Sequence, residues 1–142
     1  MYDVDDISCI YRIVNIRSEK SYIGNTKNLR TRLAEHFYTL KNGKHYNSGL
    51  QTDFDAGDEF WIEILAALKK SDNRKKRNAL EAYFVMLYNT LDEGYNMVYT
   101  YRDATHTIEA IKDNIEYISL CLRKTEIEWN KVLAGDKAVR LS

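Results

Sequence analysis

The sequence predicts an α+β fold in which a small three-stranded antiparallel sheet is flanked by helices. Two observations support this prediction. Short runs rich in β-branched and aromatic residues, separated by polar residues, are typical of strands. Longer segments instead repeat their apolar residues every three or four positions, which places those side chains along one face of a helix.

The three predicted strands follow from local composition. Residues 9–16 form an apolar run, and residues 21–24 form a second, shorter one. The polar turn between them predicts that the two strands pair as an antiparallel hairpin. Residues 59–65 alternate in a way that places Phe60 and Ile62 on one side of a third strand.

Two long helices are expected on either side of the third strand. Asn28 has the side chain of an N-cap residue, and the apolar stripe after it predicts a helix to about Leu40. Residues 41–57 are rich in glycine and form a long connection, with a helical turn near residues 48–54. A second helix is predicted from Asn73 to Leu91, and its core face consists of Leu80, Phe84, Leu87 and Leu91.

The C-terminal part, residues 105–134, is predicted to be a helical extension to a domain that covers residues 8–98. Its apolar stripe runs to Leu122, and Thr125 with Glu128 matches the capping box that would start a short last helix. The extension either belongs to the same compact unit or binds a partner, which includes a second copy of the chain.

Composition excludes several classes of protein. A hydrophobic fraction of 44% and a charged fraction of 30% are those of a folded globular protein, not of a disordered tail or a membrane span. The acidic N-terminus lacks an apolar run, so no signal peptide is expected and the simplest compartment is the cytoplasm. Cys9 and Cys121 are too few and too far apart for a disulfide framework, and both are expected to be buried thiols.

The net charge of zero requires any nucleic-acid-binding surface to be a local basic patch. Two groups of basic residues are candidates, although a run of charges is more often a solvated helix face. The first group consists of Lys69, Lys70, Arg74, Lys75, Lys76 and Arg77. The second lies after the first helix and includes Lys44 and His45.

An ordered set of motifs resembles the GIY-YIG nuclease family. The hairpin carries Ile10-Tyr11 and Tyr22-Ile23-Gly24, the first helix carries Arg32 and His36, and Glu81 and Tyr95-Asn96 follow later. Each motif is common by itself, but their order and intervals are specific. The connection after the first helix is similar to the homing-endonuclease branch more than to the excision-repair branch.

The resemblance implies an endonuclease that hydrolyses the phosphodiester bonds of nucleic acid, with DNA as the expected substrate. It also implies one divalent cation, Mg²⁺ or Mn²⁺. Glu81 is then the metal ligand, because Mg²⁺ is commonly held by one carboxylate and several waters. Arg32 presents a planar fork suited to two phosphate oxygens of the scissile group.

The remaining motif residues are expected to handle protons and to order the site. Tyr11 is the expected general base, although an ordinary phenol titrates at about 10 and needs help from nearby cations. Tyr22 lines the site, His36 shares proton transfer or holds a phosphate, and Asn96 supports the site from behind. Each residue also has a purely structural alternative. The two tyrosines could simply pack on the sheet, His36 could be a packing residue, and Asn96 could be an ordinary turn residue.

Cys9 stands where the family's name motif has its first glycine, and cysteine is a small change that the strand should accommodate. An alternative is a catalytically inactive module that binds nucleic acid with a nuclease fold. Arg32 and Glu81, which stand at the motif positions, argue against this alternative.

Overall fold

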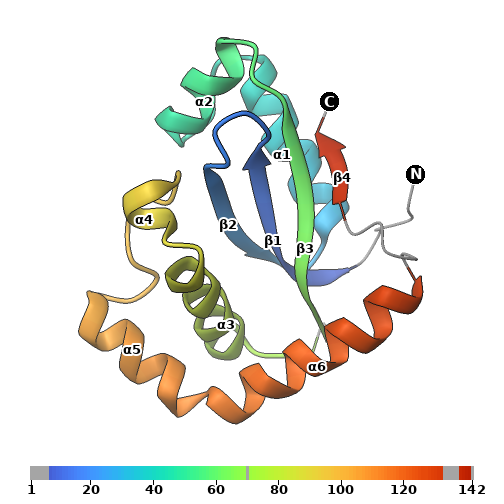
Figure 1. Ribbon diagram of the computed structural model, residues 1–142, viewed down its shortest axis with the longest axis vertical. Helices are drawn as coiled ribbons and strands as arrows, with labels where there is room; N and C mark the ends of the chain where they lie inside the picture. Colours follow the sequence, from blue (N-terminus) through green and yellow to red (C-terminus); the bar gives the residue numbers. More distant parts are fainter. Residues whose placement is uncertain (1–6, 70, 133–137, 142) are drawn as a thin grey trace.

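The computed structural model describes residues 7–69, 71–132 and 138–141, and side chains through Arg123 together with that of Thr125. Figure 1 shows a central antiparallel sheet with helices on both faces. The elements are, in chain order, β1 (Ser8–Asn15), β2 (Ser21–Thr26), α1 (Leu29–Lys41), α2 (Ser48–Asp55), β3 (Phe60–Leu68), α3 (Arg74–Leu87), α4 (Thr90–Glu93), α5 (Ala104–Asp113), α6 (Ile115–Val132) and β4 (Ala138–Leu141).

The sheet has the strand order β2-β1-β3-β4, and all of its neighbouring strands are antiparallel. The first three strands confirm the predicted sheet. β4 was not predicted, because a run of four residues is too short to display an alternating pattern; it pairs with the first half of β3. β3 extends to Leu68, three residues beyond the predicted end, because its later residues pair with the start of β1.

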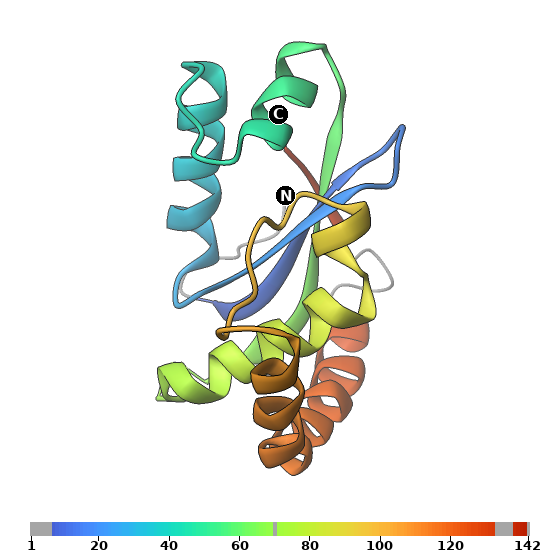
Figure 2. The same ribbon diagram turned by 90° about the vertical axis from the view of Figure 1, so that its left-hand side faces the viewer.

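The two faces of the sheet form two cores. Tyr11 and Ile13 of β1 point toward α1 and α2, where Leu29 and Leu50 cover them. Ile10 points to the opposite face, into a core that includes apolar residues of α3 and α6. Burial of each such large apolar side chain contributes about 1.5–3 kcal/mol. Figure 2 shows α1 and α2 on one side of the sheet and α3 on the other.

The predicted start of α1 is confirmed, since the side chain of Asn28 accepts a hydrogen bond from the Thr31 amide at 3.1 Å. The turn predicted near residues 48–54 is the helix α2. Asn47 caps α2 by accepting a hydrogen bond from the Leu50 amide at 3.0 Å. Both helices therefore begin at an asparagine that satisfies an otherwise unpaired backbone amide.

The prediction of one helix from Asn73 to Leu91 is wrong at its C-terminal end. Helix α3 ends at Leu87, and Asn89 adopts the left-handed conformation with a φ of 51° before α4 begins. Asparagine visits this conformation at low cost, which allows the chain to turn there. As a result Leu87 is 60% exposed and is not part of the core face.

The predicted capping box in the C-terminal part is also wrong. The helix break falls at Asn114, and Thr125 lies inside α6. The Thr125 hydroxyl donates to the Cys121 carbonyl at 2.8 Å and accepts from the Ala67 amide at 3.0 Å, which ties α6 to the end of β3. Both cysteines are buried, as predicted.

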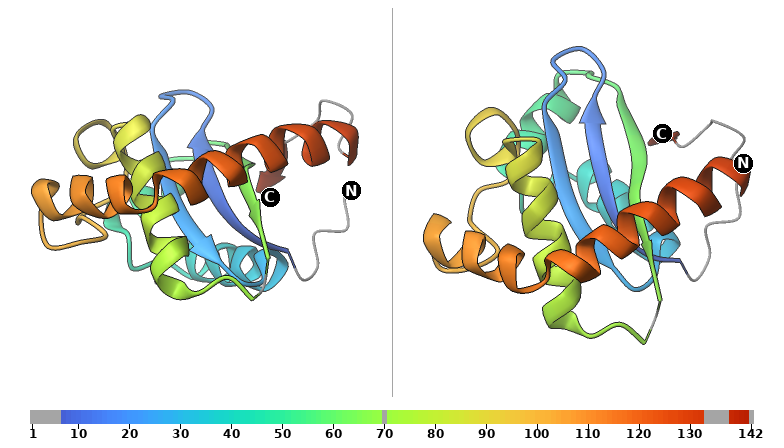
Figure 3. Two further views of the ribbon diagram at one scale, coloured as in Figure 1. Left: turned by 90° about the horizontal axis from the view of Figure 1, so that it is seen from below. Right: turned by 60° about the horizontal axis from the view of Figure 1, so that its bottom comes forward.

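Helix α6 crosses the strands obliquely on the face that α3 also covers (Figure 3). Ile118 and Cys121 of α6 are buried in the core beside Ile10. We therefore propose that the predicted C-terminal extension, which the structure describes as far as residue 132, belongs to the same compact unit as residues 8–98. In the part of the chain that the structure describes, no helix is long and apolar enough to cross a membrane.

Candidate active site

Four consecutive residues of β2 organise the candidate site. The backbone of Ile23 binds the side chain of Asn96, Gly24 makes room for Tyr11, and Asn25 binds Glu81. Tyr22 itself points toward the rings of Tyr11 and His36. Because β2 is an edge strand, groups from the helices on both faces of the sheet can meet along it.

Tyr11 lies in the interior of the site and is fully buried. It pairs with Gly24 across the hairpin, and its hydroxyl lies directly against that glycine. Burial raises the pKa of Tyr11 above that of an ordinary phenol, and the nearby positive charge of Arg32 opposes this shift. Tyr11 is therefore protonated near neutral pH, and its general-base role would require further assistance.

Two histidines lie behind Tyr11. The Nε2 atom of His36 is 2.7 Å from the Tyr11 hydroxyl oxygen, and its Nδ1 atom is 2.7 Å from the Nε2 atom of His45. The planes of the two imidazole rings are 17° apart and their centroids are 5.0 Å apart, so the rings meet edge to edge at this hydrogen bond. Burial and the nearby charge of Arg32 lower the pKa of His36 to about 3 and also lower the pKa of His45, so both rings are neutral at pH 7.

His45 differs from its predicted role as a surface contact for nucleic acid. It is 7% exposed and lies in the cluster of Tyr11 and His36, while its neighbour Lys44 is exposed. The reason is that His45 begins the turn into α2 and is held there by a hydrogen bond from its amide to Gln51. Residues 41–47 have no helical or strand period, so the sequence pattern could not indicate which side chains point inward.

Arg32 lies at the solvent-facing side of the tyrosine and histidine cluster, and its side chain is 29% exposed. One guanidinium nitrogen donates to Glu35 at 2.8 Å and another donates to the Tyr46 hydroxyl at 3.1 Å. The Tyr46 hydroxyl is also hydrogen-bonded to that of Tyr22. Arg32 is thus positioned beside the tyrosines, with a fixed positive charge that an anion can approach.

Tyr46 is a site residue that sequence reasoning missed. Its ring stacks on His45 with centroids 4.6 Å apart, and it is 54% exposed. Its hydroxyl joins the two residues that were predicted, Arg32 and Tyr22. An aromatic residue directly after His45 was the only signal for it, and by itself that signal has no specificity.

Glu81 reaches β2 from α3. Its carboxylate accepts a hydrogen bond from the Thr100 hydroxyl at 3.1 Å and is hydrogen-bonded by Asn25. Burial raises the pKa of Glu81, and these hydrogen bonds oppose the shift only in part. Within the described ranges, no lysine or arginine forms an ion pair with this carboxylate and no hydrogen bond joins it to the tyrosine cluster.

The surroundings of Glu81 fit a hydrated divalent cation. Among the residues that the structure describes, no group of three or more histidine, cysteine, aspartate or glutamate side chains is arranged to hold a metal. This donor set excludes a zinc-type cage there, but a single partly buried carboxylate without a cationic partner suits Mg²⁺, which keeps most of its water ligands.

Asn96 holds the free edge of β2. Its side-chain oxygen accepts from the Ile23 amide at 2.9 Å, and its side-chain nitrogen donates to the Ile23 carbonyl at 3.0 Å. The Tyr95 amide donates to the Ser21 carbonyl next to it. The side-chain amide of Asn96 therefore pairs with β2 as the backbone of a neighbouring strand would. This agrees with the expected role of Asn96, which is to hold other site residues in place.

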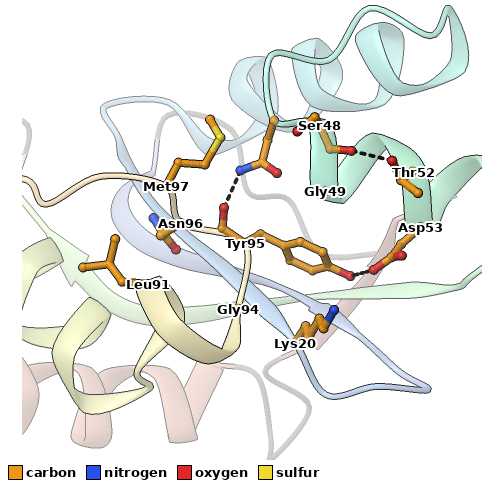
Figure 4. A pocket seen from close by; sticks show the side chains of 11 residues that line it. Lys20, Ser48, Gly49, Thr52, Asp53, Leu91, Gly94, Tyr95, Asn96 and Met97 are labelled. Carbon is orange, nitrogen blue, oxygen red and sulfur yellow. Dashed lines mark hydrogen bonds between the residues drawn. The ribbon is translucent and has the colours of Figure 1, made fainter.

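A pocket of about 580 Å³ lies beside this edge. Figure 4 shows its wall, which α2 and the segment around Asn96 form, with Lys20 at its rim. Tyr95 spans the pocket and is hydrogen-bonded to Asp53. Of the predicted catalytic residues only Asn96 lines this pocket, so it adjoins the tyrosine cluster without containing it.

The basic residues near α3 divide into exposed and buried ones. Exposed side chains at the start of α3 and just before it belong to Lys69, Arg74, Lys75 and Lys76. Arg77 is buried and donates a hydrogen bond to the Asp72 carbonyl at 2.7 Å, so its predicted role in nucleic-acid binding is corrected to a structural one. Lys70 lies outside the described residues. Arg74 is seven residues before Glu81, on the same side of α3.

The fold and these side chains define the protein as a nuclease-type domain: an arginine fork, buried phenols and imidazoles, and a lone carboxylate meet along one edge strand. The chain belongs to the GIY-YIG family, because the model of the GIY-YIG catalytic domain matches residues 7–96.

Two solved structures support this assignment. The catalytic domain of the homing endonuclease I-TevI is 28% identical, with a TM-score of 0.60, and the match covers 64% of this chain and 98% of that one. A mutant of the catalytic domain of the same intron endonuclease is also 28% identical, with a TM-score of 0.61 and coverages of 65% and 94%. This similarity is consistent with the predicted homing-endonuclease branch. No curated protein matches the chain.

Proposed function

We propose that the chain is a metal-dependent endonuclease that hydrolyses phosphodiester bonds, with DNA as the preferred substrate. The observation that carries this proposal is that Tyr11 packs against Gly24 of β2 and Glu81 reaches the next residue, Asn25, while Arg32 is joined to Tyr22 of the same strand through the Tyr46 hydroxyl. A decayed binding module would have no need to keep Arg32, Tyr11 and Glu81. The family assignment supports nuclease chemistry and a nucleic-acid substrate.

Arg32 is proposed to bind the scissile phosphate. Its guanidinium is partly exposed and permanently charged, and its planar fork matches two phosphate oxygens. The Glu35 carboxylate, which is more exposed than Arg32, now occupies one side of the fork. An incoming phosphate would therefore replace or share that contact, which costs little because exposed ion pairs contribute only about 0–1 kcal/mol.

Glu81 is proposed to hold a single Mg²⁺ or Mn²⁺ ion. The carboxylate has no cationic partner among the described residues and stays partly accessible. When bound, a divalent cation supplies positive charge that offsets the negative charge developing on the phosphate oxygens.

Tyr11 and Tyr22 are proposed to assist the attack of water. Tyr11 is hydrogen-bonded to His36 and its hydroxyl packs against Gly24, so the position of this hydroxyl is well defined. Because burial keeps this phenol protonated, its first role is to hydrogen-bond the attacking water or a phosphate oxygen, and removal of its proton would follow the arrival of further positive charge. Asn96 keeps β2, and therefore Tyr22, in place.

Incubation of the purified protein with plasmid, branched DNA and RNA tests this function directly. Each substrate is supplied with Mg²⁺, with Mn²⁺ or with a chelator. We expect cleavage of at least one DNA substrate with either cation and none in chelator. Undiminished cleavage in chelator would contradict the metal assignment. Binding without cleavage in every condition would favour the inactive binding module.

A further inference from the structure

A chain of hydrogen bonds links a backbone amide to the hydroxyl of Tyr11 through two imidazole rings. The Asn47 amide lies 3.0 Å from the Nδ1 atom of His45. The Nε2 atom of His45 lies 2.7 Å from the Nδ1 atom of His36, whose Nε2 atom lies 2.7 Å from the Tyr11 oxygen. All four residues are buried.

The first link determines the direction of all the others. A backbone N–H can only donate, so the Nδ1 atom of His45 must accept and cannot carry a hydrogen. A neutral imidazole carries one hydrogen, which therefore resides on Nε2 of His45 and is donated to Nδ1 of His36. By the same reasoning His36 carries its hydrogen on Nε2 and donates it to Tyr11.

These hydrogen-bond directions hold when both rings are neutral, and the environment of the rings favours that state. Both histidines are buried, and the charged group that faces them is the guanidinium of Arg32. Burial raises the pKa values of Tyr11 and Tyr22, so these two phenols add no negative charge near neutral pH. The pKa of each histidine is lowered accordingly.

The first member of this hydrogen-bond chain, Asn47, is held in place by its side chain. The side chain of Asn47 is 1% exposed, donates to the Tyr95 carbonyl at 2.6 Å and caps α2 through the Leu50 amide. The Asn47 amide therefore has a fixed direction, and the ring of His45 also stacks on that of Tyr46.

These directions leave the hydrogen of Tyr11 without a protein acceptor. A phenolic hydroxyl can accept a hydrogen bond and also donates its own single hydrogen. Tyr11 accepts a hydrogen bond from His36, and the nearby guanidinium of Arg32 has no acceptor to offer its hydrogen. Within the described part of the chain, no other hydrogen-bond acceptor is found for its hydroxyl hydrogen.

We propose that His45 is a positioning residue that, under the control of the Asn47 amide, makes His36 a donor to Tyr11 and directs the Tyr11 hydrogen toward a substrate oxygen or the attacking water. This inference rests on the proposed nuclease function and deepens it. Its consequence is that His36 stabilises negative charge on Tyr11 and does not take the proton from it.

Two-bond ¹H–¹⁵N correlation spectra of the ¹⁵N-labelled full chain at pH 7 test the proposal without any activity assay. The nitrogen shifts of each ring show which nitrogen carries the hydrogen. We expect the Nε2–H form for both His36 and His45. The remaining histidine, His106, is exposed on α5 and is assigned with a His106→Gln variant. An Nδ1–H form at either buried histidine would overturn the proposal.

Two variants of His45 then test its control over His36. In His45→Gln the side-chain amide can still donate to Nδ1 of His36, so the Nε2–H form of His36 should persist. In His45→Glu the carboxylate can only accept, so His36 should switch to the Nδ1–H form and become an acceptor from Tyr11. An unchanged His36 spectrum in folded His45→Glu contradicts the proposal. If that variant does not fold, the wild-type and His45→Gln spectra decide.

Cleavage by the same variants connects the spectra to function. With saturating DNA, so that the extra charge of the glutamate does not enter through binding, we expect His45→Gln to cleave faster than His45→Glu by about tenfold or more, a loss in the range of misdirected proton transfer. Equal cleavage rates would overturn the positioning role. His106→Gln should retain the wild-type rate. If the wild-type chain cleaves no substrate, the proposed function fails, while the spectra still decide the hydrogen-bond directions.

Discussion

The hydroxyl of Tyr11 lies against the α-carbon of Gly24 across the β-hairpin: a β-carbon placed on Gly24 would be 2.6 Å from the Tyr11 oxygen and 2.7 Å from its Cζ atom. Real β-carbons do not approach other atoms so closely. A glycine at this position is therefore a requirement of the Tyr11 placement and not of the turn, which lies earlier in the chain.

We predict that Gly24→Ala displaces Tyr11 and lowers the cleavage rate by about 100-fold, since a shift of about 1 Å in a reacting group has effects of that order. The overpacking should also cost about 1–3 kcal/mol of the free energy of unfolding. Gly49→Ala is the matched control, because a β-carbon there would meet Tyr95 at 3.3 Å, a much milder contact than the one at Gly24. Wild-type cleavage by Gly24→Ala would contradict the placement of Tyr11.

Tyr46→Phe removes the hydroxyl that joins Arg32 to Tyr22 but keeps the ring that stacks on His45. A hydrogen bond of this kind is worth about 0.5–1.5 kcal/mol, so we predict a loss of up to about tenfold in cleavage rate with little loss of stability. Kinetics and urea unfolding measure the two effects. Tyr38→Phe, on the exposed side of α1, should change neither. Equal cleavage rates for the two variants would show that the Tyr46 hydroxyl has no role in the site.

Much of the fold was predictable because its signals are local. The hairpin, α1 and the first part of α3 follow from alternation, helical period and capping asparagines. The end of α3 was not predictable, since Leu87 fits the helical stripe and only the left-handed Asn89 interrupts the helix. β4 exists through its pairing with β3, a contact between distant parts of the chain that no local pattern contains.

The candidate site shows the same division. Motif residues that a pattern can name, such as Tyr11 and His36, do meet in space. The sequence could not show that His45 and Arg77 are buried, because burial depends on packing against distant segments. Tyr46 was missed for the same reason: its partners are 24 and 14 residues away in the chain.

The basic end of α3 is predicted to bind phosphates through Arg74 and Lys75, which are exposed, and not through buried Arg77. The double variant Arg74→Gln, Lys75→Gln should weaken DNA binding and reduce the slope of log affinity against log salt by about 1 per lost phosphate contact. Fluorescence anisotropy over a salt series measures this slope. The charge-matched pair Lys112→Gln, Arg123→Gln on α5 and α6 should leave it unchanged. Identical slopes for both pairs would mean that Arg74 and Lys75 form an ordinary solvated helix end and do not contact phosphates.

Stability should decrease as the pH falls below neutrality. His36 has a pKa of about 3 when folded and about 6.5 when unfolded, so the unfolded chain binds more protons between these values. Stability from the neutral ring is complete above about pH 6.5 and is lost progressively below it, by about 2 kcal/mol at pH 5. Urea unfolding at pH 7 and pH 5 measures this loss. His36→Gln should reduce the difference, and an undiminished pH dependence in that variant would assign it to other groups.

The most direct test of the account is cleavage and binding by Glu81→Gln, measured side by side on one DNA substrate with Mg²⁺. The change keeps the size and helix propensity of the side chain and removes the charge that is proposed to hold the ion. It also removes a partly buried carboxylate whose pKa is raised, so the fold should be at least as stable. The account predicts that cleavage falls by orders of magnitude while binding persists or tightens, because a carboxylate without its cation repels phosphate. Robust cleavage by Glu81→Gln would contradict the proposed mechanism.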